Sequence, residues 1–204
     1  MRILALSDNV VSHIYGPAIT QSFADVDLIV GCGDLPSAYL EYIVTLLPAP
    51  LIYVPGNHDP DRYIVPGGIN IDGRIVNVCG YWFMGLGGSQ RYKNRGKHQY
   101  TEFDMNLRVA RLLPRLLYNR MRYGRALDVL VTHSPAWGIH DARDVAHTGF
   151  RVFLRLIQWF RPRLMLHGHT HILQNIQVAE TEYLGCRIIN VFPARTVTLL
   201  QPRA

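Results

Sequence analysis

Three histidines spaced by single residues around a glycine follow a short apolar run near the C-terminal end of the chain. Residues 164–171 read Leu-Met-Leu-His-Gly-His-Thr-His, which is typical of a buried strand that ends in metal-type ligands. If the strand continued, its alternation would point His167, His169 and His171 to the same side. Gly168 allows the backbone to turn instead, so that two imidazoles can be directed at different points of one site. A solvated, histidine-rich turn is the alternative.

Ligand-type residues also follow apolar runs earlier in the chain. Together with the C-terminal pair, the set is Asp8, Asp34, Asn57, His133, His169 and His171, with His58 alongside. Carboxylate, amide and imidazole groups suit Mn, Fe or Zn rather than a thiolate-bound structural zinc. Six ligands exceed one tetrahedral site, so the set predicts two cations, about 3.5–4 Å apart, which activate a bridging hydroxide and clamp a phosphoryl group. Asp34 is the candidate bridging carboxylate, and His58 is then free to neutralise charge or to protonate the leaving oxygen.

Alternating strands and helices must position these residues. The sequence predicts strands over 2–6, 26–30 and 51–54, with helices over 17–24 and 37–47. This spacing is typical of parallel βαβ winding, in which ligands bind beyond the carboxyl ends of the strands. Because Asp8, Asp34 and Asn57 each follow a predicted strand, we expect them to converge.

The central part of the chain has a different character. Residues 75–78 and 81–84 predict a hairpin or meander, and the glycine-rich stretch 85–89 fits a tight connection better than a phosphate cradle, because it lacks a Walker lysine. The basic stretch 90–100 is expected to be an exposed loop. Within it, Arg91 and Tyr92 are candidate substrate contacts, with plain exposure as the alternative.

A helix is predicted to begin at Thr101, which precedes acidic residues and resembles an N-cap. Pro114 predicts that this helix kinks or restarts. Arg108, Arg111 and Arg115 share one of its faces, and we expect that face to meet solvent rather than nucleic acid.

The C-terminal part continues the strand and helix pattern. The predicted elements are a strand over 128–131 that leads to His133, a helix over 149–160, and closing strands over 176–178, 187–191 and 196–200. No linker or repeat interrupts the sequence, so we expect a single domain over residues 1–204.

Composition agrees with a folded, non-membrane protein. Of the 204 residues 49% are hydrophobic and 18% are charged, and the net charge of +6 suits an anionic ligand such as a phosphate ester or nucleic acid. The three cysteines lack CxxC spacing, which favours a reducing, cytoplasmic compartment. The N-terminal apolar run is too short for a signal peptide, and no stretch approaches the length of a membrane span.

The motifs, taken in order, resemble those of one known family. Asp8, Gly33-Asp34, Gly56-Asn57-His58-Asp59, His133 and Gly168-His169-Thr170-His171 resemble the motif set of the calcineurin-like metallophosphoesterases, over nearly the whole chain. The resemblance implies a four-layer α/β/β/α sandwich with two mixed β-sheets and metals at the strand ends. It also implies that Asp8, Asp34 and His171 hold one metal, that Asp34, Asn57, His133 and His169 hold the second, and that His58 is catalytic. The implied reaction is hydrolysis of a small phosphate ester by a metal-bound hydroxide, with a phosphodiester favoured because the basic stretch 90–98 could hold a flanking group.

One motif departs from the family pattern. The family usually has Asp-x-His at its first motif, but here Val10 stands where the histidine belongs, and valine cannot bind metal. The first site then holds metal with extra water, binds it weakly, or recruits His13. Two other functions stay open: a scaffold for protein interactions that has lost turnover, which Val10 suggests, and a nucleic-acid binder, which rests on net charge alone.

Residues near the motifs also have plain structural interpretations. His167 is expected to face the core or to support a ligand through a hydrogen bond. Asp59 and Asp61 are expected to cap the loop after Asn57, with orientation of His58 as the alternative, and Cys32 is expected to be a small buried residue.

Overall fold

A computed structural model describes residues 1–94, 96–171 and 179–199 of the chain. The first half contains β1 (Arg2–Leu6), α1 (Ile19–Ser22), β2 (Leu28–Gly31), α2 (Ser37–Leu46), β3 (Leu51–Tyr53), β4 (Gly68–Asn70), β5 (Arg74–Val78), β6 (Tyr81–Leu86), β7 (Ser89–Gln90) and β8 (Gln99–Tyr100). The second half contains α3 (Glu102–Tyr123), β9 (Val129–Thr132), α4 (Arg151–Phe160), β10 (Leu164–His167), β11 (Glu180–Tyr183), β12 (Cys186–Asn190) and β13 (Ala194–Thr198). No described helix is both long and apolar enough to cross a membrane.

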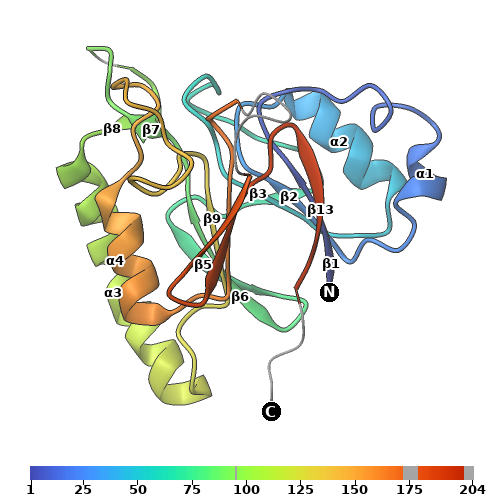
Figure 1. Cartoon of the computed structure of the whole chain (residues 1–204). Coiled ribbons are helices and arrows are strands. Elements are labelled where there is room, and N and C mark those ends of the chain that lie inside the picture. Colours follow the sequence, from blue (N-terminus) through green and yellow to red (C-terminus); the bar gives the residue numbers. More distant parts are fainter. Residues whose placement is uncertain (95, 172–178, 200–204) are drawn as a thin grey trace.

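Two mixed sheets form the centre of the fold (Figure 1). The five-stranded sheet has the order β13-β1-β2-β3-β4, in which β1 to β4 are parallel and β13 is antiparallel to β1. The six-stranded sheet has the order β11-β12-β10-β9-β6-β5, with antiparallel strands at both edges. The predicted parallel winding of β1, β2 and β3 is therefore confirmed, and so is the hairpin of β5 and β6.

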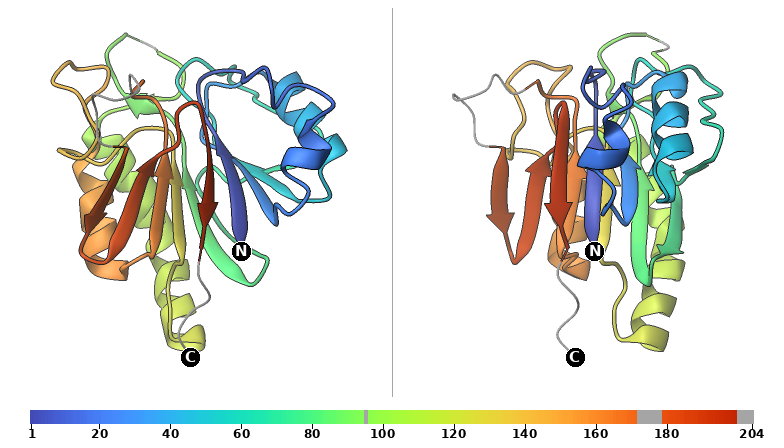
Figure 2. Two further views of the ribbon diagram at one scale, coloured as in Figure 1. Left: turned by 45° about the vertical axis from the view of Figure 1, so that its right-hand side comes forward. Right: turned by 90° about the vertical axis from the view of Figure 1, so that its right-hand side faces the viewer.

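Helices cover the outer faces of the sheets, as the two views in Figure 2 show. Helices α1 and α2 pack on the five-stranded sheet, and α3 and α4 pack on the six-stranded sheet. The order of layers is α/β/β/α, which confirms the fold class expected from the sequence.

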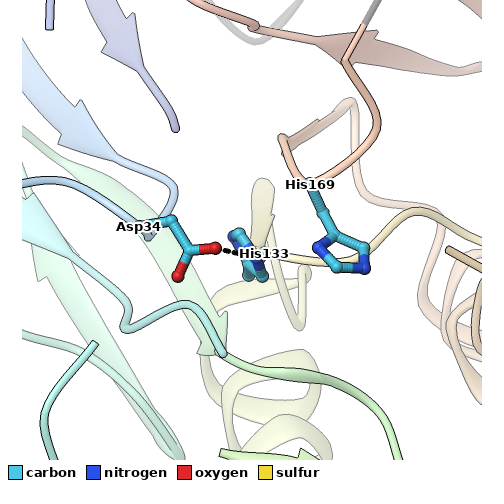
Figure 3. A group of neighbouring side chains, drawn as sticks. All are labelled: Asp34, His133 and His169. Carbon is cyan, nitrogen blue, oxygen red and sulfur yellow. Dashed lines mark ion pairs between the residues drawn. The ribbon is translucent and has the colours of Figure 1, made fainter. Parts of the chain in front are cut away.

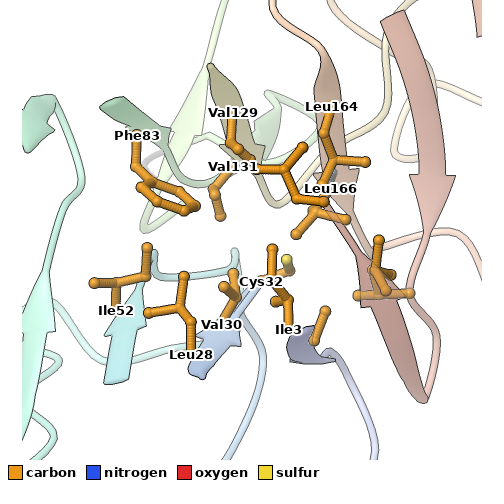
Figure 4. Close-up of a cluster of buried hydrophobic side chains, with 14 of the residues drawn as sticks. Ile3, Leu28, Val30, Cys32, Ile52, Phe83, Val129, Val131, Leu164 and Leu166 are labelled. Atoms are coloured by element: carbon orange, nitrogen blue, oxygen red, sulfur yellow. The ribbon is translucent and has the colours of Figure 1, made fainter. Parts of the chain in front are cut away.

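The inner core lies between the two sheets (Figure 4). In β1, Ile3 and Ala5 face this core, whereas Leu4 and Leu6 face the helices on the other side. Strands buried on both faces read as continuous apolar runs rather than alternating ones. This explains why the strands that carry the site were visible in the sequence.

Helix α3 begins as its sequence predicts but does not restart at Pro114. Thr101 accepts a hydrogen bond from the Asp104 backbone, and the Asp104 carboxylate accepts one from Thr101 in return. The helix continues through Pro114 because buried residues on both sides, such as Val109 and Leu116, keep it packed on the sheet. Its proline lies on the exposed face.

The prediction that one face of α3 meets solvent is only partly correct. Arg111 and Arg115 are exposed, but the Arg108 side chain is 12% exposed and forms an ion pair with Asp72. Arg108 also donates to the Gly87 carbonyl at 3.0 Å. It therefore fastens α3 to the connection after β6, a role that spacing along the helix does not reveal.

Several short elements differ from expectation. Strands β4, β7, β8 and β11 were not predicted, and the predicted helix over 17–24 shrinks to the single turn of α1. The tight connection after β6 is reduced to residues 87–88, because Gly85 and Leu86 belong to the strand. Among the closing strands, β12 and β13 are present, and the one predicted over 176–178 lies outside the described residues.

Candidate metal centre

Loops at the carboxyl ends of strands from both sheets meet in one pocket of about 240 Å³. Its lining residues are Asp8, Asp34, His58, His147, His169 and His171. Five of these six were proposed from the sequence. The sixth, His147, was not.

Three side chains form the centre of the site (Figure 3). Asp34, His133 and His169 each offer one ligand atom, and these atoms lie within 4.8 Å of one another. The Nε2 atom of His133 lies 3.3 Å from Oδ2 of Asp34, and the rings of His133 and His169 are 4.7 Å apart between centroids. A carboxylate and two imidazoles this close form a donor set that suits Mn, Fe or Zn.

Hydrogen bonds behind the two histidines fix how their rings face the site. His133 Nδ1 lies 2.8 Å from the Cys32 carbonyl, and His169 Nε2 lies 2.7 Å from the Ala146 carbonyl. A carbonyl only accepts, so each of these nitrogens carries a proton and the other nitrogen of each ring is turned to the cluster. Metal-binding histidines in proteins are usually anchored in this way.

Asn57 is buried beside His133. Its Oδ1 atom lies 3.0 Å from His133 Nε2, and its Nδ2 atom donates to the Tyr92 hydroxyl at 3.2 Å. Tyr92 thus contacts a candidate ligand, whereas the Arg91 guanidinium pairs with Asp104 at 3.0 Å. Substrate binding by these two residues stays a prediction.

Asp8 and His171 form the other side. The Oδ1 atom of Asp8 lies 3.6 Å from Nε2 of His171, and the Oδ2 atom of Asp8 accepts from the His169 backbone at 2.9 Å. The His171 ring stacks on Phe192 with 4.5 Å between centroids. One carboxylate therefore contacts both histidines of the C-terminal motif.

The loop after β3 is held by two buried or half-buried carboxylates. The Oδ2 atom of Asp59 accepts from the backbone of Asp34 at 2.9 Å and of Gly56 at 2.7 Å, and Asp34 Oδ1 accepts from the His58 backbone at 2.8 Å. The expectation that Asp59 caps this loop is confirmed. These bonds tie the loops after β2 and β3 to each other and bring His58 to the pocket.

The backbone at three of the site residues is in the left-handed region. The φ angles are 66° at Asp8, 56° at Asp34 and 65° at His169. Such a conformation is uncommon outside glycine, and clusters of it mark functional sites. Gly168 also allows a close approach, since a Cβ atom at this position would collide with Ser7 Oγ. Neither feature can be read from the types of the ligand residues.

Burial and neighbouring charges shift the pKa values of the side chains in the site. Burial disfavours protonation of His133, but the Asp34 carboxylate outweighs it and raises the His133 pKa to about 9. Burial and the charge of His133 lower the His169 pKa to about 4. Burial also opposes ionisation of Asp8, yet the neighbouring His171 and His133 lower its pKa to about 2. Near pH 7 the metal-free site thus contains ionised carboxylates, a protonated His133 and a neutral His169.

Two supporting residues behave as expected. His167 is buried, and its Nδ1 and Nε2 atoms lie 3.1 Å from the Gly168 carbonyl and 3.0 Å from His140 Nδ1. Cys32 is fully buried, and its contribution to the site is the carbonyl that anchors His133.

Neither Val10 nor His13 lies in the pocket. Val10 is 44% exposed and does not line the pocket. His13 lines a separate hollow with Ile14, Phe23 and other residues, so the structure does not bring it in as a substitute.

His147 is a pocket residue that the sequence did not predict, and its ring lies 5.0 Å from that of His169 between centroids. The only signal for it in the sequence was a loop rich in histidine and aspartate, and no strand end marked it.

Two solved structures illustrate what the chain is similar to. TT1561 of Thermus thermophilus is similar in structure, with a TM-score of 0.62 at 16% identity over 93% of this chain and 88% of that chain. A single mutant of Vps29 from Entamoeba histolytica matches at a TM-score of 0.41 and 16% identity, over 93% of this chain and 73% of that one. No curated protein matches the chain in sequence. The family model described as calcineurin-like phosphoesterase matches residues 1–173, and the chain therefore belongs to the calcineurin-like phosphoesterase family.

Proposed function

We propose that this protein is a metal-dependent phosphoesterase that hydrolyses a small phosphate ester. The observation that carries the proposal is the cluster of Asp34, His133 and His169, whose ligand atoms lie within 4.8 Å of one another. Both imidazoles are anchored from behind on backbone carbonyls, which leaves one nitrogen of each for a cation. The membership of the chain in a phosphoesterase family supports the same conclusion.

The ligand set divides between two positions. Asp34, Asn57, His133 and His169 would hold one cation, and Asp8, Asp34 and His171 would hold the other, with Asp34 shared. Support for the first group comes from the contacts of His133 with Asp34 and Asn57, and support for the second from the pairing of Asp8 with His171. We propose Mn, Fe or Zn as the metals, because the donors are oxygen and imidazole nitrogen.

When bound, divalent cations supply Lewis acidity that turns water into a nucleophile and stabilises charge on phosphoryl oxygens. The chain's own residues do the remaining work. His58 lines the pocket, so its imidazole can donate a proton to the leaving oxygen of the ester. Its backbone is fixed by Asp34, which couples the position of the proton donor to that of the shared ligand.

A phosphodiester is the preferred substrate class in this proposal. The end of the basic stretch lies against the loop that follows His58, since His98 Nε2 is 3.0 Å from the Pro60 carbonyl and Lys97 pairs with Asp61 at 3.6 Å. The hydroxyl of Tyr92 reaches Asn57 from the same stretch. A second ester group could therefore be held beside the pocket, in the cytoplasmic compartment that the cysteine pattern favours.

The test compares Asp34→Asn and His169→Ala with wild type on bis-p-nitrophenyl phosphate and p-nitrophenyl phosphate. We expect both variants to lose turnover and bound metal while remaining folded by circular dichroism. His13→Ala is the matched control, because this histidine lies in a separate hollow. Full activity of folded Asp34→Asn would refute the proposal, and faster monoester than diester hydrolysis by wild type would reverse the substrate preference.

Val10 favours one further candidate, a scaffold that retains the fold without turnover. This candidate predicts that wild type purified without chelator contains no metal and hydrolyses neither ester. Elemental analysis of that preparation separates the two functions.

A further inference from the structure

His147 borders the metal pocket although it comes from a long loop rather than from a strand end. Its Nδ1 atom lies 2.8 Å from Oδ1 and 3.0 Å from Oδ2 of Asp144, and its backbone N donates to the same carboxylate at 3.1 Å. The ring of His147 is packed against that of His169. Asp144 therefore holds both the backbone and the ring of His147 in one orientation.

The loop that carries His147 is itself closed by hydrogen bonds. Asp141 accepts from the backbone of Gly138 at 2.9 Å and of Gly149 at 3.1 Å, which joins the two ends of the loop. The Ala142 backbone donates to the His147 carbonyl at 3.2 Å, and Thr148 donates to the Asp144 carbonyl at 2.7 Å. The loop is also tied to the site through Ala146, whose carbonyl anchors His169. His147 is thus held in place before any ligand arrives.

His147 repeats the arrangement seen at the two central histidines. His133 and His169 each have one ring nitrogen on a carbonyl, and His147 has its Nδ1 on a carboxylate. A carboxylate behind a histidine fixes the Nδ1–H tautomer and makes Nε2 a better ligand. Nε2 of His147 makes no hydrogen bond to a described residue, so its lone pair is free to bind a cation.

Among the described residues that line the pocket, His147 is the one imidazole that the sequence motifs do not account for. It packs against His169, one of the three residues whose ligand atoms lie close together.

We propose that His147, held by Asp144, is a further ligand of the metal centre through Nε2. This inference rests on the proposed function, because it requires that the pocket bind a cation. It assigns Asp144 as a positioning residue that acts through His147.

The test measures metal binding directly, without turnover. Apo-protein is titrated with Mn²⁺ by calorimetry and with Co²⁺ by visible absorption, for wild type, His147→Ala, His147→Gln and Asp144→Asn. We expect His147→Ala and His147→Gln to lower the affinity at least about 10-fold and to change the Co²⁺ spectrum, because the coordination sphere loses a nitrogen. Asp144→Asn should lower the affinity roughly 10-fold without removing the nitrogen ligand. His13→Ala is the matched control and should behave as wild type.

The outcomes separate this inference from the proposed function. If wild type binds metal and both His147 variants bind it with unchanged affinity and an unchanged Co²⁺ spectrum, the role of His147 is refuted while the phosphoesterase proposal stands. If wild type binds neither Mn²⁺ nor Co²⁺, both are refuted. The side chains of His147 and Asp144 are 44% and 56% exposed, so the variants are expected to fold, which circular dichroism checks.

Discussion

Nε2 of His133 and Oδ2 of Asp34 lie 3.3 Å apart, and this contact joins the two sheets of the sandwich. Asp34 follows β2 of the five-stranded sheet, whereas His133 follows β9 of the six-stranded sheet. The site is therefore built across the interface between the sheets. A cation bound by both residues would act as a crosslink between them, and this has consequences for stability.

Metal removal is expected to destabilise the protein. A ligand present at about 100 times its dissociation constant stabilises the native state by about 2.7 kcal/mol. For a chain of this size, that corresponds to a fall in Tm of roughly 5–10 °C on addition of EDTA. Differential scanning calorimetry of wild type measures it, and Asp34→Asn should show almost no response to the chelator. An equal response in both proteins would contradict the crosslink.

Metal binding is expected to release a proton near pH 7. The His133 pKa of about 9 means that its imidazole is protonated in the metal-free protein, and a cation can bind it only after that proton leaves. The affinity should therefore rise with pH up to about 9. Calorimetry in buffers of different ionisation enthalpy should give about one proton released per site at pH 7 and almost none above about pH 9.5. Proton release that does not depend on pH would show that the proton does not come from His133.

The same pair makes the metal-free protein sensitive to pH. Because the folded pKa of His133 is raised from 6.5 to about 9, its contribution to stability is complete below pH 6.5 and is lost as the pH rises through 9. His169 acts in the opposite direction, since its folded pKa of about 4 makes protonation destabilising as the pH falls from 6.5 to 4. Urea unfolding of apo-protein should therefore show greatest stability near neutral pH. Asp34→Asn should lose the decline on the alkaline side.

Gly168→Ala is expected to displace Ser7 and Asp8 and so to weaken the metal site. The added methyl group would collide with Ser7 and the Asp8 carboxylate, both of which lie against this turn. We expect a loss of about 1–3 kcal/mol of stability, typical of overpacking, together with weaker metal binding. Gly16→Ala is the matched control, because its methyl group would meet only an ordinary contact at 3.5 Å from the Ser12 carbonyl. Chemical denaturation and metal titration of both variants make the comparison.

Substitutions of the adjacent residues Tyr92 and Arg91 are expected to have different effects on kcat/KM. Tyr92→Phe removes the hydroxyl that accepts from Asn57, so kcat/KM should fall roughly 2- to 10-fold, the value of one hydrogen bond. Arg91→Ala breaks a largely exposed pair with Asp104, which is worth about 0–1 kcal/mol, and should leave kcat/KM almost unchanged. Steady-state kinetics on the diester substrate test both. A larger loss in Arg91→Ala would mean that this arginine leaves Asp104 to bind substrate.

The sequence predicted the parts of the fold that depend on local patterns. Apolar runs that end in polar residues located β1, β2, β3, β9 and β10, and the residues after them do meet in one pocket. The N-cap at Thr101 was visible for the same reason, since its hydrogen bonds lie within one turn. The short edge strand β4 was missed because its partner β3 lies before a long connection, whereas β11 forms a hairpin with the next strand, β12, that the apolar pattern did not reveal.

The remaining features depend on contacts between distant residues. Arg108 was expected in solvent, but its guanidinium forms an ion pair with Asp72 and donates to the Gly87 carbonyl, and both of these residues lie in another part of the chain. His147 belongs to the pocket only because its loop folds back over His169. Neither fact leaves a periodic or motif-like trace in the sequence.

The left-handed backbone at Asp8, Asp34 and His169 has an evolutionary consequence. Each such residue carries a cost of about 1–3 kcal/mol that glycine would avoid. Selection for heat resistance alone would therefore favour glycine at such a position only where the hydrogen bonds and ion pairs of the side chain stabilise the fold by less than this cost, and any such gain would remove a side chain of the pocket. Thermostabilisation of this protein should accordingly keep these three residues fixed and seek its gains elsewhere.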